Sequence, residues 1–292
     1  MNWRSGFVAL ATIALAVAAL PAQEWRLDTT YTWETNLSRT SNAPDWENGA
    51  LYDATLTGAW HRQLAPDWLA TGQIEAGAEQ VRPFPGLDNE SVAAEFDLRR
   101  KFGLGPFAPT LTFMGRVGYL DFHEDDRSHE NLQTGLTLAK RLTETWRLSA
   151  SGTWNEDRAS VDPFSIRNQR LTIETDWEVI EGWQLTGGAS RLWGQLTANA
   201  NEDVFAQAQT GSLGPAAAAY YRSVAFEHST AFDTDWVAYR IDCRADLWWA
   251  GITIALGEHT SLPLRYESAN VTNRAQVSYR SELWSLSVVH RF

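Results

Sequence analysis

The chain has 292 residues, a formal net charge of −12 and 15 tryptophans. Its acidic balance excludes a nucleic-acid-binding function, because such proteins need a basic surface against the phosphate backbone. The single cysteine, Cys243, excludes an internal disulfide. So many tryptophans require surroundings that suit an apolar ring with one polar edge, and the two interfaces of a membrane provide them.

Residues 1–22 are predicted to be a secretory signal peptide. Arg4 precedes an uncharged apolar run over residues 7–20, which is too short to cross a membrane comfortably, and a cleavage site follows at Ala22. Residues 23–292 contain no linker, so we expect a single domain. No later apolar run is long enough for a transmembrane helix. A closed barrel is then the one spanning structure that satisfies its backbone hydrogen bonds in lipid.

The chain alternates in polarity from residue 25 onward. In the first segment Trp25, Leu27, Thr29, Tyr31 and Trp33 fall on one face, and Arg26, Asp28, Thr30, Thr32 and Glu34 fall on the other. This period of two indicates a strand with one apolar and one polar face. Similar segments follow along the chain, and short turns near residues 65–67, 143–145 and 181–182 mostly reopen on tryptophan. A hairpin-and-loop unit recurs about every 39 residues, as in an up-and-down barrel.

The short turns alternate with longer acidic connections near residues 36–49, 83–89, 123–130 and 155–168. Membrane barrels have short periplasmic turns and long outer loops, so the tryptophan-bearing turns should face the periplasm. The longest connection, residues 197–242, has room for a short helix or extra strand pairing. We predict an all-β fold: a transmembrane antiparallel up-and-down β-barrel of twelve strands. Ten or fourteen strands stay open, because that connection is ambiguous.

The last stretch, residues 280–292, carries the same alternation to a terminal aromatic residue. Its apolar positions are Trp284, Leu286, Val288 and Phe292, with His290 in the same series. The stretch resembles the closing strand of bacterial outer-membrane β-barrels of the porin-like superfamily. That resemblance implies an integral protein of a Gram-negative outer membrane, in contact with lipid and lipopolysaccharide. It also implies that the barrel assembly machinery reads these four apolar residues. A homo- or hetero-oligomer remains open.

The face opposite the apolar one carries many charges of both signs, and in a barrel it would line the lumen. The positive residues are Arg26, Arg99, Arg116, Arg141, Arg147, Arg170, Arg265 and Arg291. The negative residues are Asp28, Glu34, Asp53, Glu75, Glu79, Glu95, Asp97, Glu174, Asp176, Glu178 and Glu267. One interpretation is a network of ion pairs that packs the lumen. The other is a narrow polar pore whose opposed charges orient a small solute.

Most tryptophans fall on the apolar face near strand ends, which predicts membrane girdles. This girdle set is Trp33, Trp60, Trp68, Trp146, Trp154, Trp177, Trp183, Trp248 and Trp284. Two others, Trp193 and Trp249, have the opposite or an uncertain parity. These two are candidates for stacking against a sugar in the lumen.

The acidic run at residues 123–130 is the one local cluster that suggests a metal. Glu124, Asp125 and Asp126 are weak candidates for Ca²⁺, because their density suits a hard cation but no EF-hand spacing is present. The alternative is a solvated outer loop, whose carboxylates share divalent cations with lipopolysaccharide. No metal or other cofactor is predicted.

Catalysis has little support, although some outer-membrane barrels place a histidine with serine, asparagine or aspartate at the rim. The six histidines are His61, His123, His129, His228, His259 and His290, and none lies in a motif that we can match. We expect a narrow channel for small hydrophilic solutes. The alternatives are a non-conducting barrel that serves as scaffold, adhesin or export accessory through residues 197–242, and a rim hydrolase.

Overall fold

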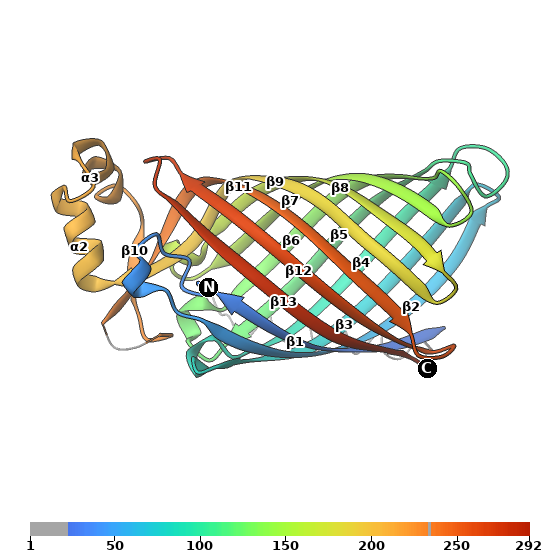
Figure 1. Cartoon of the computed structure of the whole chain (residues 1–292), viewed down its shortest axis with the longest axis horizontal. Helices are drawn as coiled ribbons and strands as arrows, with labels where there is room; N and C mark the ends of the chain where they lie inside the picture. The colour runs from blue at the N-terminus through green and yellow to red at the C-terminus, as the bar shows by residue number, and fades with distance from the viewer. Residues whose placement is uncertain (1–22, 233–234) are drawn as a thin grey trace.

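The computed structural model describes residues 23–232 and 235–292, so the predicted signal peptide lies outside the described residues. Twelve strands form a closed antiparallel barrel (Figure 1). They are β1 (Glu24–Thr35), β2 (Gly49–Ala65), β3 (Trp68–Arg82), β4 (Asn89–Lys101), β5 (Thr110–Phe122), β6 (His129–Arg141), β7 (Trp146–Ala159), β8 (Ile166–Ile180), β9 (Trp183–Asn201), β11 (Trp236–Ala255), β12 (Thr260–Asn273) and β13 (Ser278–Arg291). Pairing of β1 with β13 and of β9 with β11 completes the ring, which confirms the predicted twelve-stranded barrel.

The alternation seen in the sequence separates the two faces of the wall. On the inward face, Thr30 Oγ1 of β1 lies 2.8 Å from Ser287 Oγ of β13. On the outward face, the rings of Tyr31 and Tyr52 lie with centroids 5.3 Å apart. Outward positions elsewhere hold large apolar side chains, such as Ile173, which is 62% exposed. A water-soluble monomer seldom exposes so continuous an apolar wall, whereas lipid would cover it.

The two ends of the barrel differ in their connections. The chain enters at Glu24 and leaves at Phe292 at the short-turn end, where most connections are brief. At the other, long-loop end, four loops each contain one 3-10 turn: η1 (Ala43–Asp45), η2 (Pro85–Leu87), η3 (Asp125–Arg127) and η4 (Asp162–Phe164). The fifth connection there is the tight turn between β12 and β13. The sixth is the long segment between β9 and β11.

This long segment contains α2 (Glu202–Thr210), α3 (Pro215–Tyr221) and β10 (Phe226–Ser229), which pairs with the edge of β11. It is shorter than the predicted loop, because β9 and β11 stay paired beyond the barrel rim as far as Asn201 and Trp236. Packing replaces the lipid–lumen alternation there, so Ala198 and Ala238 are both buried and no two-faced pattern marks the strands. Within the described residues, no helix has the length and apolarity that a membrane crossing requires.

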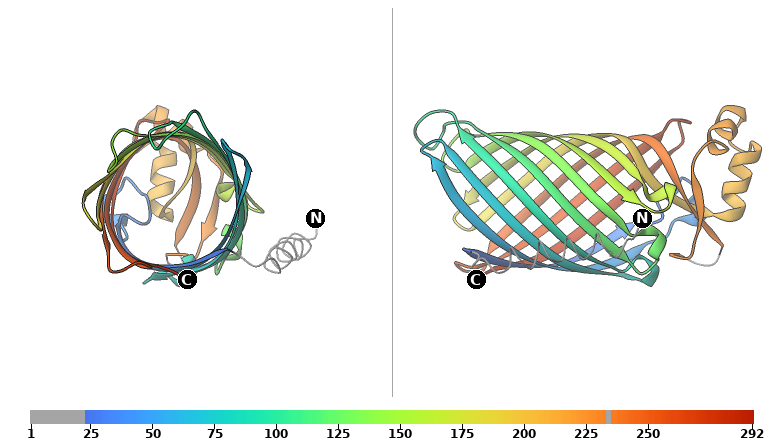
Figure 2. Two further views of the ribbon diagram at one scale, coloured as in Figure 1. Left: turned by 90° about the vertical axis from the view of Figure 1, so that its right-hand side faces the viewer. Right: turned by 180° about the vertical axis from the view of Figure 1, so that it is seen from behind.

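Gly194 marks the point where β9 leaves the barrel wall. Its φ of 131° favours glycine, and a Cβ there would overlap the backbone of Arg167 on β8. Gly194 is also the last β9 residue that pairs with β8. Seen end-on, the strands form a ring, and the continuation of β9, with α2 and β10, projects across its far opening (Figure 2). We call this projecting part, residues 195–232 and 235–242, the cap.

Candidate functional site

The inward face of the barrel wall carries ion pairs that water reaches. Arg116 Nη2 on β5 lies 2.7 Å from Glu75 Oε2 on β3, and the two side chains are 28% and 23% exposed. Beside them Gln73 Nε2 donates to Glu95 Oε1 at 3.2 Å. Both side chains of the Arg116–Glu75 pair are therefore only partly buried, although they face the inside of the barrel.

A second inward cluster surrounds Trp249 on β11. The guanidinium of Arg265 lies 4.8 Å from the centroid of the Trp249 ring, and that of Arg170 lies 5.9 Å from it, which are cation–π distances. Arg265 Nη2 also pairs with Glu267 at 2.5 Å. The ring lies against Gly188 of β9, where a Cβ would overlap it. Trp249 is thus held flat against the wall by two arginines and is itself buried.

Trp193, the other candidate for sugar stacking, lies elsewhere. It lines a groove on the outward wall with Leu171 and Phe113. Its ring therefore faces the outside of the barrel rather than the lumen. The parity of Trp193 was uncertain in the sequence, because β9 is irregular at the adjacent Gly194.

The other predicted lumen residues also lie at inward register positions. Arg26 pairs with Asp28 at 2.7 Å, and Glu34 accepts a hydrogen bond from Ser281 Oγ at 2.9 Å. The remaining members are Asp53, Glu79, Asp97, Arg99, Arg141, Arg147, Glu174, Asp176, Glu178 and Arg291. Five of these, Arg141, Arg147, Asp176, Glu178 and Arg291, line a cavity of about 500 Å³ at the short-turn end. A second cavity of about 460 Å³ beside it includes Arg99. We call these two cavities the vestibule.

The long-loop end is closed by the cap. Phe205 of α2 and Tyr221 of α3 pack with Tyr239 of β11, at ring-centroid distances of 4.9 and 5.9 Å from it. This core continues onto inward residues near the rim, including Val271 and Tyr279. Between the cap and the β1–β2 loop a space of only about 10 Å³ remains, which is about the size of one water.

The cap also contacts each of the other five connections at this end. Asn199 N donates to Ser38 O of the β1–β2 loop at 3.0 Å, and Arg274 N of the β12–β13 turn donates to Asp242 O at 2.9 Å. Arg240 Nη1 donates to two carbonyl oxygens of the β7–β8 loop, at 2.9 and 2.7 Å. Phe232 packs against Phe84 of the β3–β4 loop, with ring centroids 4.9 Å apart and the rings tilted. The cap therefore contacts every other connection at this end, and a cavity of about 570 Å³ is lined by α3, β11 and the β12–β13 turn.

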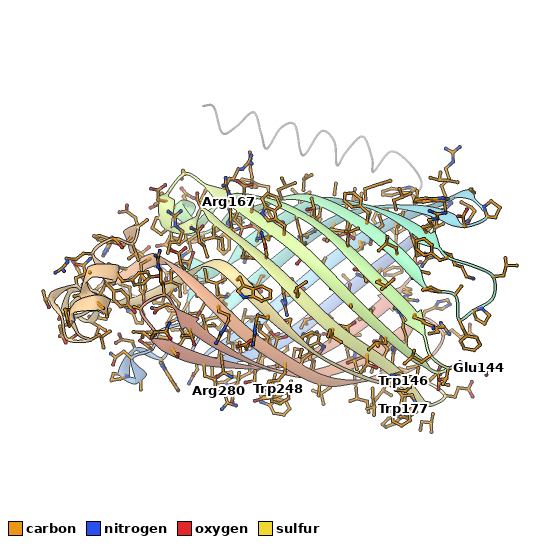
Figure 3. All side chains as sticks on the ribbon, turned by 90° about the horizontal axis from the view of Figure 1, so that it is seen from above. Glu144, Trp146, Arg167, Trp177, Trp248 and Arg280 are labelled. Carbon is orange, nitrogen blue, oxygen red and sulfur yellow. The ribbon has the colours of Figure 1, made fainter. Side chains whose placement is uncertain are left out.

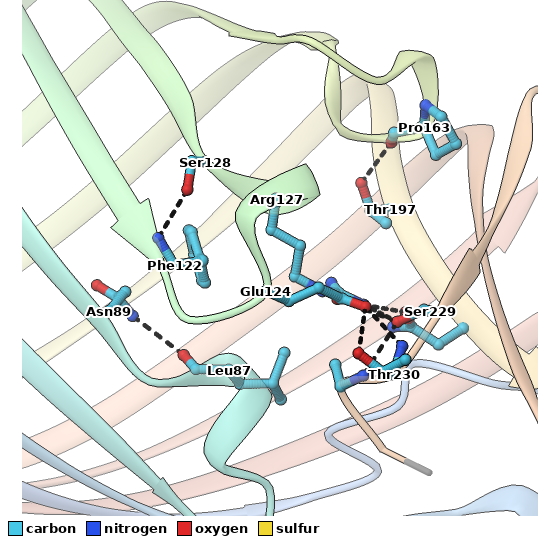
Figure 4. Close-up of polar contacts among 12 residues, drawn as sticks. Leu87, Asn89, Phe122, Glu124, Arg127, Ser128, Pro163, Thr197, Ser229 and Thr230 are labelled. Atoms are coloured by element: carbon cyan, nitrogen blue, oxygen red, sulfur yellow. Dashed lines mark hydrogen bonds and ion pairs between the residues drawn. The ribbon is translucent and has the colours of Figure 1, made fainter. Parts of the chain in front are cut away.

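The fifth contact is a buried ion pair in the β5–β6 loop, shown in Figure 4. Glu124 pairs with Arg127 and also accepts hydrogen bonds from Ser229 Oγ at 3.1 Å and from Thr230 N at 2.6 Å. Arg127 Nη2 donates to Asn199 Oδ1 at 2.8 Å and to Ser229 Oγ at 2.9 Å. Its guanidinium also lies 4.6 Å from the ring of Phe164. We call this group the latch.

The latch uses Glu124, which the sequence suggested as a weak metal candidate with Asp125 and Asp126. Its two carboxylate oxygens bind protein donors instead. No group of three or more His, Cys, Asp and Glu suited to a metal occurs in the described part of the chain. The latch could not be predicted from the sequence, because its members are joined across 72 to 106 residues.

Three of the six histidines make defined polar contacts. His61 Nδ1 lies 3.1 Å from Thr71 Oγ1, and His290 Nδ1 lies 2.9 Å from Thr260 Oγ1. His129 Nδ1 lies 2.7 Å from Arg127 O, whereas its Nε2 lies 4.0 Å from Asp157 Oδ1, which exceeds hydrogen-bond distance. His259 lines the vestibule, while His123 and His228 belong to the long-loop end. A rim hydrolase remains a prediction without an assembled set of catalytic groups.

The predicted girdle residues lie outward at both ends of the wall. Toward the long-loop end, Tyr266 lies between Trp248 and Trp284, with ring centroids at 5.2 and 4.6 Å, and Trp33 pairs with Trp284. At the short-turn end Trp146 pairs with Trp177, and Figure 3 shows both far from Trp248. The rest of the set, Trp60, Trp68, Trp154 and Trp183, occupies outward register positions.

The predicted assembly signal lies on the outward face of the closing strand. Trp284, Leu286, Val288 and Phe292 are all exposed, and β13 pairs with β1 along its length. Phe292 N donates to Trp25 O at 2.9 Å, so the last residue is still joined to the wall. Its ring, 70% exposed, lies edge-on to His290, with centroids 4.7 Å apart.

No family model and no curated protein matches the chain. Several solved structures have a similar fold. The COG4313 outer membrane channel from Pseudomonas putida F1 is 10% identical, with a TM-score of 0.57 over 94% of this chain and 97% of that chain. The NanC porin is 6% identical, with a TM-score of 0.45 over 90% and 98%. The KdgM porin is 8% identical, with a TM-score of 0.42 over 91% and 99%.

At these identities the likeness is one of fold, and the TM-score of 0.57 supports it. The chain has the same closed antiparallel barrel fold as that outer membrane channel. This confirms the general resemblance that the closing strand indicated.

Proposed function

We propose that the protein is an outer-membrane channel for small hydrophilic solutes and that the cap closes its outer mouth in this structure. The observation that carries the proposal is the water-accessible Arg116–Glu75 pair above an open vestibule. A barrel that served only as a scaffold would gain more from a lumen packed with apolar side chains, because isolated buried charges are costly. Charges kept in water fit a solute pathway instead.

The proposed location of the protein rests on the apolar outward face of the barrel and on the closing strand β13. An apolar outward face between two tryptophan-bearing bands fits a lipid bilayer. The long-loop end would then face the outside of the cell. We therefore propose integral insertion in the outer membrane, with lipid and lipopolysaccharide as neighbours. Assembly through the apolar residues of β13 is part of the same proposal.

The charges of the lumen favour cationic or zwitterionic solutes. Carboxylates outnumber arginines on the inward face, and they gather on β1 to β4, where Asp28, Asp53 and Glu95 lie. Arg170 and Arg265 lie outside this acidic wall, on β8 and on β12, and β13 separates β12 from β1. A solute with a positive group would gain favourable interactions along the acidic side.

A second candidate is a non-conducting scaffold or adhesin that uses the cap as its partner surface. The ordered helices α2 and α3 and the capped mouth favour it. The two candidates differ in what happens when the cap is released. A channel then conducts, whereas a scaffold loses its binding surface and stays electrically silent.

Single-channel recording in planar bilayers tests the proposal. Wild-type protein should show rare, brief openings, and a variant with a weakened latch should conduct steadily. Heat-dependent migration on a denaturing gel would verify that each sample is a folded barrel. Folded protein that stays silent with both an intact and a weakened latch would overturn the channel and favour the scaffold.

A further inference from the structure

Two exposed arginines are held side by side on the outward wall, near the long-loop end. Glu156 Oε1 of β7 lies 2.9 Å from Arg158 Nε and 2.6 Å from Arg167 Nη2. The carboxylate side chain is only 5% exposed, whereas the arginines are 60% and 69% exposed. Glu156 thus fixes the positions of two guanidinium groups. We call this group the arginine clamp, and Figure 3 shows Arg167 at the rim.

The clamp keeps hydrogen-bond donors for an external ligand. A guanidinium has five N–H donors, and Glu156 takes up Nε of Arg158 and Nε and Nη2 of Arg167. The remaining donors lie on exposed groups. Paired planar guanidiniums match the oxygens of a phosphate, which arginine binds in a bidentate manner.

An apolar groove lies directly next to the clamp on the same wall. It has a volume of about 430 Å³ and is lined by Phe113, Leu136, Trp154, Leu171 and Trp193, among others. The strand register fixes the position of the groove. Trp154 pairs with Gln169, and this pair lies one outward position nearer the barrel centre than the pair of Glu156 and Arg167. Gly152 of β7 leaves the groove open, because it has no side chain beside Leu171.

The order along the wall is that of a lipid: an apolar groove, then tryptophan, then arginine. Trp154 and Trp193 suit the interface between acyl chains and head groups, and arginines just beyond it suit the phosphate level. On the neighbouring side of the wall the outward positions near this rim are acidic, with Glu90, Asp121 and Glu130 on β4 to β6. A phosphate is therefore attracted to the clamp and repelled from the next strands.

We propose that the clamp and groove form a binding site for one phosphorylated lipid of the outer leaflet, with its phosphate on Arg158 and Arg167 and an acyl chain in the groove. The site is outside the barrel and independent of solute passage. Glu130 lies across from Arg158 on β6 and is the nearest opposing charge. Its removal should strengthen the site.

Native mass spectrometry of the full-length barrel in a phosphate-free detergent, titrated with purified lipid A, tests the proposal. Wild type should retain one lipid. The double variant Arg158→Gln, Arg167→Gln should bind at least about ten-fold more weakly, since it loses charged hydrogen bonds. Gly152→Leu should weaken binding by filling the groove without a charge change, and Glu130→Gln should increase affinity. Arg62→Gln, on the outward face near the short-turn end, is the matched control and should bind as wild type.

Two further arms separate a lipid from a free anion. Lipid A stripped of its phosphates should lose the preference for wild type over the double variant, and millimolar inorganic phosphate should compete only weakly. Equal binding by wild type and the double variant would overturn the site. So would inorganic phosphate binding as tightly as the lipid. Single-channel conductance should be the same in all these variants, so a failure here is distinct from a failure of the channel proposal.

Discussion

Glu124 Oε1 accepts a hydrogen bond from Thr230 N at 2.6 Å, across 106 residues of sequence. The same carboxylate pairs with Arg127, whose guanidinium reaches β9 at Asn199. Burial lowers the pKa of Arg127, and the adjacent Glu124 carboxylate opposes that shift. Each charge of the pair therefore depends on the other. One ion pair in the β5–β6 loop joins the rim of the barrel to two parts of the cap.

We expect Glu124→Gln to release the cap. Removal of one partner from a buried ion pair costs about 3–5 kcal/mol, because the other charge is left uncompensated. Single-channel recording should show higher open probability, and limited proteolysis should cut residues 202–235 faster. Glu90→Gln, an exposed carboxylate on the wall of β4, should behave as wild type. A Glu124→Gln barrel as silent and as resistant as wild type would show that the latch does not hold the cap.

We expect Arg116→Glu to increase cation selectivity. In water a unit charge at about 4 Å contributes about 1 kcal/mol, which corresponds to about five-fold in a permeability ratio. The reversal potential in a KCl gradient, measured in the Glu124→Gln background, should move toward the cation value. Arg62→Glu makes the same charge change on the outward face and should leave it unchanged. An unaltered reversal potential for Arg116→Glu would place the ion path away from this pair.

We expect Gly188→Ala to destabilise the barrel by about 1–3 kcal/mol, because its Cβ would overlap the Trp249 ring. Gly187→Ala is the matched control, since its Cβ would lie 3.5 Å from the nearest atom, Trp249 O, which is an ordinary contact. Urea unfolding in lipid vesicles measures both. Adding Trp249→Leu to Gly188→Ala should restore part of the loss. If Gly188→Ala were as stable as Gly187→Ala, Trp249 would not be pressed against this wall.

We expect the α3 end of the cap to detach at high pH. Burial raises the pKa of Tyr220, whose hydroxyl accepts a hydrogen bond from Asp242 N at 2.9 Å, to about 12. The raised pKa stabilises the docked form below pH about 10, where an unfolded tyrosine is still protonated, and the stabilisation is lost as pH rises through about 12. The tyrosinate absorbance of wild type minus that of Tyr220→Phe should have its midpoint near 12. A midpoint near 10 would show that Tyr220 is not buried against β11.

The fold followed from the sequence because each barrel strand has an apolar outward face and a polar inward face. That contrast produces an alternation with a period of two, as with Tyr31 and Thr32, and short turns mark the ends of the strands. The lumen charges followed for the same reason, since inward parity places Arg116 and Glu75 on one surface. The fold and the lumen charges could be inferred because both depend only on residues that are close together in the sequence.

The cap followed only in part: the long connection holds the short helices and the extra strand pairing that the sequence allowed, but the extent of its strands was missed, because they lack that contrast. Ala198 and Ala238 are buried on strands that no lipid borders, so the pattern that identified the barrel is missing there. The latch and the arginine clamp are contacts between distant segments. Arg127 meets Asn199, and Glu156 meets Arg167, only after the strands have paired. Sequence alone marks such residues as ordinary charges of a loop or a strand end.

We expect Phe292→Ala to slow assembly without weakening the assembled barrel. The Phe292 ring is 70% exposed, so its loss should change the unfolding free energy by no more than about 0.5 kcal/mol. Its backbone hydrogen bond to Trp25 stays intact. Pulse-chase labelling in cells should show fewer folded barrels per unit time, while urea unfolding of the purified barrel stays unchanged. Leu104→Ala, a fully exposed apolar residue in the β4–β5 connection, is the control and should alter neither measurement. If Phe292→Ala assembled at the wild-type rate, the terminal aromatic would not be a recognition signal, and if it unfolded at much lower urea, the ring would instead be a structural part of the seam between β13 and β1.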